Sequence, residues 1–499
     1  MADPSPASSP GDAPTGEEAA ARYASALGDV AAIGKGERAG LFAGPYRRLF
    51  TAQVVSSLGD WVGFLAITSL AARAGKSNAD VAVGVVLSAR LLPGFFFGAF
   101  ATAVLDRWDR KKIMVTCDIG RGLIVGLLPF VHTVPGLFLA SLVLELLTLM
   151  WTPAKEASVP NLVPPEKLAA ANSASLASAY GTILPAAALF PGLTLVAEAL
   201  AHVHALRFFR LSQESLAIYL DVLTFFASAA IISRLVLPRK SAAERLAAPA
   251  ATLGSTWREV KEGWRFIGQT YRVRAVIIGF CTGLIGGGMV VPLGVTFSAK
   301  ILHKGPTGFG LLEFALGLGV AIGVLALTVG QRHLDHDRVF SLAVAGAGVS
   351  IIFAAAMSRL LLVMLGIAGL GVCAGTVYVL GFTILGASTT DDIRGRIFGV
   401  FYTLVRLCLL LAFTLAPLAS GVLDGLSAHL HRRAHGVTIR GEVGTAAFHV
   451  ALPGTRLTLW LGGIIILAAA WSARRDLHKA AALAEPIDGA SPDDAPQSP

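Results

Sequence analysis

Five ionisable side chains stand inside long apolar stretches of the sequence, where water would not surround them. They are Asp60, Arg90, Glu145, Glu313 and Arg406. An ionisable group at bilayer depth costs roughly 2.5 kcal/mol or more, so each needs a partner or a function. A buried carboxyl can exchange a proton at working pH, because desolvation and nearby cations act on its pKa in opposite directions. These residues are therefore candidates for proton coupling or substrate binding.

Two interpretations remain open for these charges. Asp60, near the middle of its stretch, either exchanges a proton or is permanently paired with Arg90 or Arg121 and holds helices together. Arg90 and Arg406 either bind an anionic group of a substrate or act as counter-ions to carboxylates, and the second role is favoured. Glu145 and Glu313 are the remaining candidates for proton or cation binding.

Other chemistries find little support in the residue pattern. The four cysteines lie in separate apolar runs without the short spacing of a zinc or redox motif. Histidines in two loops are more typical of solvated segments than of a metal site, which requires fixed geometry. We find no nucleophile-elbow, metalloprotease or phosphate-loop pattern. We expect no catalytic residue, metal or cofactor, and no enzymatic activity.

The composition indicates which elements must hold the buried charges. The chain of 499 residues is 54% hydrophobic and 15% charged, whereas soluble proteins are roughly 25% charged. A membrane helix needs about 20 mostly apolar residues. The sequence predicts an all-α integral membrane protein with about twelve such spans, at 49–72, 80–104, 113–131, 135–152, 169–197, 216–237, 274–299, 308–330, 339–358, 360–387, 396–424 and 457–473.

A polar gap divides the spans into two sets of six. Within it, a capping-box pattern and an apolar stripe with flanking Arg and Lys predict an amphipathic helix on the membrane surface, or alternatively a soluble helix packed on other loops. Asp106 and Asp335, 229 residues apart, suggest that the halves repeat. We expect a disordered N-terminal tail, an N-terminal half, a linker, a C-terminal half and a disordered C-terminal tail, at 1–45, 46–237, 238–273, 274–476 and 477–499.

The loop after the second predicted span carries a charged motif, TAVLDRWDRKK, at 102–112. It resembles the signature loop of the major facilitator superfamily. In that resemblance Asp106, Arg107, Arg110 and Lys111 occupy the charged positions, and Asp109 replaces the usual Gly. The resemblance implies the major facilitator fold, with two six-helix halves around a central site.

Charges at a helix end can form pairs that hold one of two conformations until transport breaks them. We therefore predict a cytoplasmic gate at this loop, joined by Asp118 and Arg121 near the start of the third span. The simpler alternative is that the basic residues only fix the orientation of the chain, because cytoplasmic loops are rich in Lys and Arg. The bias of Lys and Arg among the loops predicts that both termini are cytoplasmic.

Further segments resemble the bacterial branch of this superfamily that contains the enterobactin exporter and macrolide efflux proteins. They are SSLGDW, SARLLPGFFFGAF, CDIGRG, TPAKEASVPNLVPPEKLAAANS, EGWRFIG and DDIRGRIFGVFYTLVR. The fifth span keeps Gly181 and Pro185 of the family's antiporter motif but has Leu184 and Ala188 in place of glycines. Pro93, Pro185 and Pro417 are expected to kink their helices, because proline frees a carbonyl.

The function that this resemblance implies is secondary active transport, and we expect proton-coupled efflux of amphipathic small molecules through the plasma membrane. The expected partners are a small-molecule substrate, the proton and the lipid bilayer, and the chain is expected to act as a monomer. No nucleic-acid motif accompanies the net charge of +9. The alternatives are a non-transporting sensor or scaffold of the same fold and a membrane-embedded lipid-processing enzyme.

Overall fold

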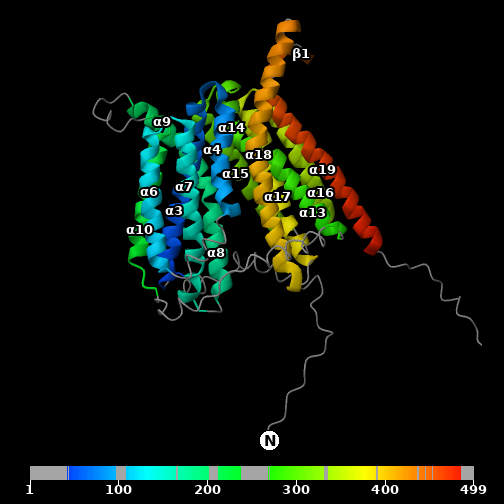
Figure 1. Ribbon diagram of the computed structural model, residues 1–499. Coiled ribbons are helices and arrows are strands. Elements are labelled where there is room, and N and C mark those ends of the chain that lie inside the picture. The colour runs from blue at the N-terminus through cyan, green and yellow to red at the C-terminus, as the bar shows by residue number, and fades with distance from the viewer. Residues whose placement is uncertain are drawn as a thin grey trace, which may run out of the picture.

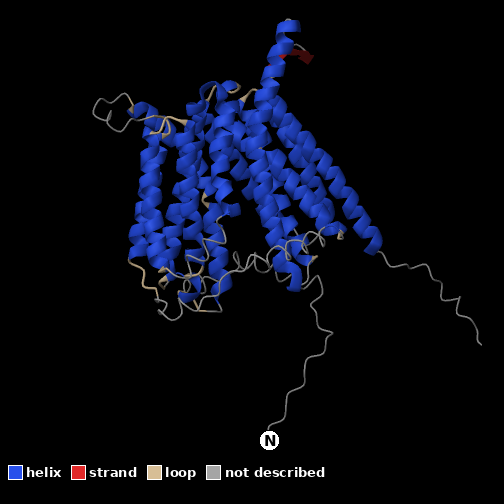
Figure 2. Cartoon of the chain, viewed as in Figure 1, coloured by secondary structure: helices blue, strands red, loops and turns tan. Residues whose placement is uncertain are grey.

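The computed structural model describes residues 42, 44–96, 108–164, 167–201, 212–237, 268, 270–330, 335–388, 391–434, 438–443, 446–451 and 453–484. It is a bundle of long helices, in which the first set of spans lies beside the second (Figure 1). The described strands, β1 (Thr438–Val443) and β2 (Ala446–Ala451), pair antiparallel beyond the end of the bundle (Figure 2). Within the described ranges, eleven helices are long and apolar enough to cross a membrane. The expected all-α membrane fold is confirmed.

Each predicted span corresponds to one helix or a pair of helices. The first six spans are α3 (Tyr46–Gly75), α4 (Ala79–Phe96), α6 (Arg110–Leu127), α7 (Val134–Glu156), α8 (Leu168–Gly181) with α9 (Ile183–Leu200), and α10 (Ser215–Ser233). The other six are α13 (Tyr271–Gly288) with α14 (Val290–Lys300), α15 (Gly305–Gly330), α16 (His336–Ala356), α17 (Leu360–Ala387), α18 (Asp391–Ala434) and α19 (Gly454–Ala484). Short 3-10 turns are η1 (Lys76–Asn78), η2 (Leu128–Phe130) and η3 (Val159–Asn161). The predicted amphipathic linker helix lies outside the described residues.

The helix starts repeat between the two sets of spans. α13, α15, α16 and α17 begin 225, 226, 226 and 226 residues after α3, α4, α6 and α7. Asp109 and Asp335 also match in role, because each caps the helix that follows it by accepting two backbone N–H bonds. By its capping role and its spacing of 226 residues, the counterpart of Asp335 is Asp109. It is not Asp106, which the sequence had suggested.

The fifth and seventh spans are each broken near the middle. α8 ends at Gly181, four residues before Pro185, and α13 ends at Gly288, four residues before Pro292. Proline has no N–H to bond the carbonyl four residues earlier, so the ladder is interrupted at that glycine. Pro93 and Pro417, in contrast, lie within continuous helices, α4 and α18.

The two sets of spans meet closely at one end of the bundle. We call this end, where α3 ends and α4 begins, the hairpin face, and the end where α3 begins the terminal face. A Cβ at Gly84 of α4 would lie 2.3 Å from a carbonyl oxygen of α18. The hydroxyls of Thr194 in α9 and Thr307 in α15 are 3.0 Å apart. Ser420 of α18 donates to Asp80 of α4 at 2.6 Å. These contacts join the halves on the side of the hairpin face.

Candidate functional site

A small pocket inside the first set of helices is lined by four charged side chains. Asp60 of α3, Arg90 of α4, Arg121 of α6 and Asp221 of α10 all line it. The pocket has room for about one water molecule. Charged groups from four helices therefore face each other across a very small volume.

Arg121 is almost completely enclosed in this cluster. Its guanidinium pairs with the carboxylate of Asp118 one helical turn away, and Ser228 of α10 donates to the second oxygen of Asp118 at 2.7 Å. The guanidinium carbon also lies 4.5 Å from the ring centre of Phe225 and 5.2 Å from that of Trp151, which are cation–π distances. The side chains of Arg121 and Asp118 are 2% and 0% exposed. They form a fixed, buried ion pair.

Asp60 contacts the same guanidinium more loosely. Its Oδ2 lies 3.6 Å from Nη1 of Arg121, and its side chain is 33% exposed. Because Arg121 already has Asp118 as a close partner, its charge stays compensated when Asp60 changes partner. Asp60 is thus the accessible carboxylate of the network.

Asp221 was not among the site residues predicted from the sequence. This carboxylate is buried in α10 and is packed against α3, where a Cβ at Gly63 would lie 2.0 Å from Oδ2 and one at Gly59 would lie 2.6 Å from Oδ1. Thr224 offers a hydroxyl to Oδ1 at 3.4 Å, and the charges of Asp60, Arg90 and Arg121 act on the carboxyl. Asp221 is a lone acidic residue within the sixth predicted span, so the rule that singled out Asp60 would have found it.

Glu145 and Arg406 extend the cluster beyond the pocket, next to Arg90. Nη1 of Arg90 is buried and has no hydrogen-bond partner among the described residues, while its guanidinium carbon lies 5.4 Å from the ring centre of Phe64. Glu145 of α7 interacts electrostatically with several of these groups, most strongly with Arg90 and also with Arg406. Arg406 comes from α18 in the second set of helices, and its Nη1 lies 3.5 Å from the carbonyl oxygen of Gly94 in α4.

The structure corrects the position expected for Asp118 and Arg121. From the sequence, both residues were expected at the gate, near the start of the third span. α6 begins at Arg110, and at 1.5 Å per residue Asp118 and Arg121 stand roughly 12 and 16 Å along the helix. They lie at the depth of Asp60, which Arg121 contacts, so they belong to the central charge cluster.

The gate loop is described only in part. Asp106 and Arg107 lie outside the described residues. Asp109 caps α6 by accepting from the backbone N–H groups of Lys111 and Lys112 at 2.9 and 3.3 Å. Arg110 donates to the carbonyl oxygen of Ala157 at the end of α7. This end of α6 is thereby fixed to the end of α7.

Glu313 stands apart from the cluster. Its side chain on α15 is 8% exposed, and no described charge forms an ion pair with it. Gly310 and Gly317, three residues before and four after it, approach α9, where a Cβ would lie 2.8 Å from Phe190 and 3.5 Å from Leu184, respectively. Glu313 therefore lies near the contact between the two sets of helices. Within the described ranges, no three His, Cys, Asp or Glu side chains form a group that could hold a metal ion, and the absence of a metal site stays a prediction.

The comparisons with known proteins agree with this architecture. The model of the Major Facilitator Superfamily matches residues 49–413. The uncharacterized MFS-type transporter YfiS of Bacillus subtilis is 26% identical over 383 residues, which cover 73% of this chain and 84% of that protein. The uncharacterized MFS-type transporter Rv0037c of Mycobacterium tuberculosis is 25% identical over 382 residues, covering 74% and 83%.

Solved structures of transporters share the fold at low sequence identity. A bacterial homologue of the human lysosomal transporter Spinster, in an inward-facing and unoccupied conformation, has a TM-score of 0.66 at 13% identity, covering 87% of this chain and 98% of that one. The nucleoside transporter NupG has a TM-score of 0.60 at 12% identity, covering 86% and 99%. These similarities concern the fold alone.

Proposed function

The chain belongs to the major facilitator superfamily and is a multi-pass membrane transporter, and from that premise we propose that it exports amphipathic small molecules in exchange for protons by alternating access. It acts as a monomer in the plasma membrane with both termini in the cytoplasm. The observation that carries this proposal is the position of Asp60. Its carboxylate is partly exposed and shares Arg121 with the buried Asp118.

This arrangement suits an exchange site because the carboxylate of Asp118 is held in a close ion pair with Arg121, whereas that of Asp60 is not. When Asp60 binds a proton or a cationic group, it releases Arg121, whose charge stays compensated by Asp118. The cost of breaking the longer contact is small, since a partly exposed ion pair is worth about 1 kcal/mol or less. Binding at Asp60 therefore leaves the ion pair that holds α6 in place.

The balance of charges around the site favours binding of a positive group. Four carboxyls face three guanidinium groups: Asp60, Asp118, Glu145 and Asp221 against Arg90, Arg121 and Arg406. At bilayer depth an uncompensated charge is costly, so the cluster requires one additional positive charge. A proton and a cationic group of a substrate can each supply it, and competition between them would couple export to proton entry. Trp61 and Phe64 beside Asp60 provide aromatic surface for the apolar part of a substrate.

The contacts between the halves support alternating access. With cytoplasmic termini, the hairpin face is the outer face, and the contacts of Thr194 with Thr307 and of Asp80 with Ser420 close it. The site would then be reached from the cytoplasm in this conformation. We also retain the proposal that the loop with Asp106 is a gate. Equal transport by Asp106→Asn and the parent would remove that part of the proposal.

The test is transport by the purified full chain in proteoliposomes with an imposed proton gradient. We would screen cationic amphipathic dyes, macrolides and siderophores. The parent should move at least one of these only when the gradient is present, and Asp60→Asn should lose the dependence on the gradient. The matched control is Glu214→Gln, which removes an ion pair with Arg73 at 2.8 Å at the hairpin face, away from the pocket.

Three outcomes would contradict the proposal. Full gradient-driven transport by Asp60→Asn would exclude its coupling role. Failure of every compound to move in the parent would favour a non-transporting scaffold. Turnover of a lipid or isoprenoid without a gradient would favour a membrane-embedded enzyme.

A further inference from the structure

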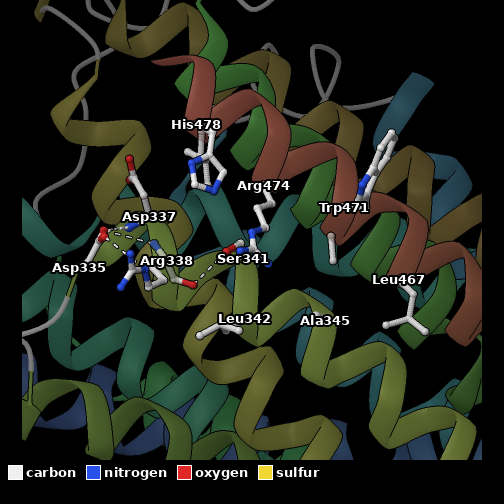
Figure 3. A pocket seen from close by; sticks show the side chains of 12 residues that line it. Asp335, Asp337, Arg338, Ser341, Leu342, Ala345, Leu467, Trp471, Arg474 and His478 are labelled. Carbon is white, nitrogen blue, oxygen red and sulfur yellow. Dashed lines mark hydrogen bonds and ion pairs between the residues drawn. The ribbon is translucent and has the colours of Figure 1, made fainter. Parts of the chain in front are cut away.

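A groove between α16 and α19 lies outside the charge cluster and is not used by the proposed transport mechanism. Figure 3 shows its lining, with side chains from both helices. Its volume is about 600 Å³. Near the terminal face it is lined by charged side chains and a histidine: Asp335, Asp337, Arg338, Arg474 and His478. Further along the helices the lining is mainly apolar: Leu342, Ala345, Leu467, Ala470 and Trp471.

The apolar walls of the groove face outward. Leu342 is 60% and Trp471 is 68% exposed, which in a membrane-spanning helix places them toward lipid. Ala345 and Ala470 are small and leave space between the two helices. The groove thus combines a polar mouth with an apolar trough that is open to the bilayer.

The length of the groove matches one leaflet of a membrane. Arg338 and Ala345 are seven residues apart on α16, and His478 and Leu467 are eleven apart on α19. At 1.5 Å per residue these separations span roughly 10 and 16 Å. Half of a hydrocarbon core of about 30 Å is about 15 Å. A lipid with its headgroup at the mouth would therefore have its chain along the trough.

The charges at the mouth favour an anion. Both oxygens of Asp337 are bound by Arg272 at 2.9 Å, and Asp335 accepts the first backbone N–H groups of α16. Arg338 is 78% exposed and lies 4.0 Å from Asp335, at the limit of an ion pair. For Arg474, no carboxylate of the described residues lies within ion-pair distance. Three guanidinium groups, those of Arg272, Arg338 and Arg474, thus stand against the carboxylates of Asp335 and Asp337 at the mouth, so its net charge is positive. Guanidinium binds phosphate well.

The first half of the chain does not offer the same groove in its described residues. The counterpart of α16 is α6, and Lys112 lies 226 residues before Arg338. The corresponding last helix, α10, has 19 residues, whereas α19 has 31. The additional turns of α19 carry Arg474 and His478. Within the described ranges, the turns that carry this mouth belong to α19 and have no counterpart in α10.

We propose that this groove binds one anionic glycerophospholipid, with its phosphate against Arg338 and Arg474 and an acyl chain along Leu342, Ala345 and Trp471. The lipid is a ligand of the membrane-facing surface and is not the transported substrate. It would bridge α16 and α19 at the level of the headgroups. Basic side chains at this level attract anionic lipid, with about 1 kcal/mol for each residue.

The experiment is native mass spectrometry of the full chain in non-ionic detergent with equal amounts of phosphatidylglycerol and phosphatidylcholine. The parent should retain one phosphatidylglycerol in preference to phosphatidylcholine. The double variant Arg338→Gln/Arg474→Gln should bind phosphatidylglycerol roughly 30-fold more weakly. Lys112→Gln, at the matching position of the first half, should behave as the parent. Ala345→Phe fills the trough without changing charge and should also lose the lipid.

Thermal unfolding gives an independent readout. Phosphatidylglycerol should raise the unfolding temperature of the parent and of Lys112→Gln more than that of the double variant. Equal binding of phosphatidylglycerol by the parent and the double variant would overturn the proposal. Equal retention of phosphatidylcholine by the parent, or displacement of the lipid by inorganic phosphate at the same concentration, would overturn it as well.

Discussion

Asp118 and Asp60 contact the same guanidinium, and replacing each of them by Asn should have very different costs. Asp118→Asn removes the close partner of Arg121, which is 2% exposed. Breaking a buried ion pair from one side costs about 3–5 kcal/mol. Since the Asn amide can still accept a bond from Ser228, we expect a value near the lower end. Asp60→Asn removes a partner at 3.6 Å that is 33% exposed, which should cost about 1 kcal/mol or less.

The assay is equilibrium unfolding in mixed dodecyl maltoside and sodium dodecyl sulfate micelles, followed by tryptophan fluorescence. The two variants should differ in the free energy of unfolding by about 2–4 kcal/mol. The double variant Asp118→Asn/Arg121→Gln should recover part of the loss, because both charges of the buried pair are then removed and Asp60, which also loses Arg121, is 33% exposed. Equal destabilisation by Asp60→Asn and Asp118→Asn would refute the division into a held and an exchangeable carboxylate.

Two further predictions follow from close contacts between helices. Gly63→Ala should lower the free energy of unfolding by about 1–3 kcal/mol, because the new Cβ would lie 2.0 Å from Asp221. The control is Gly192→Ala, where the Cβ would meet open space. It should be neutral or stabilising in the same unfolding assay. Thr194→Cys/Thr307→Cys, in a chain without its native cysteines, should form a disulfide across the halves, since the two hydroxyls are 3.0 Å apart. Oxidation should then stop transport in proteoliposomes and reduction should restore it, whereas full transport in the cross-linked state would contradict closure at the hairpin face.

The spans were predictable because the requirement for them is local. A stretch of about 20 apolar residues satisfies its own backbone hydrogen bonds wherever it lies in the fold. Each predicted span therefore corresponds to a helix or a helix pair, including the long stretch 396–424 within α18. The breaks after Gly181 and Gly288 were not placed, although each lies four residues before a proline. That spacing is visible in the sequence and follows from the missing N–H of proline.

The composition of the charge cluster was less predictable, since it depends on how the helices are rotated and how far they extend. Arg121 was assigned to the gate, although it was also named as a possible partner of Asp60, because the sequence does not show which neighbouring helix its side chain faces. Asp221 was overlooked, and its proximity to Asp60 depends on Gly59 and Gly63 letting α10 approach α3. Glu313 satisfied the same sequence criterion as Asp60 but lies on α15 in the second half, near the contact with α9. Burial of a charge can be predicted from hydropathy, whereas its partners require the packing.

The charge cluster also suggests how movement of the halves would be coupled to the proton under the proposed function. Asp60, Asp118 and Asp221 lie on helices of the first half, but Arg406 comes from α18 in the second. Its charge acts on Glu145, and its contact with Gly94 spans the two halves. If the halves separate where Arg406 contacts Gly94, the carboxyls of Asp60, Asp118, Glu145 and Asp221 keep only Arg90 and Arg121 as counter-ions. The cluster then requires one more positive charge than before, so a change of conformation and the uptake of a proton would each favour the other.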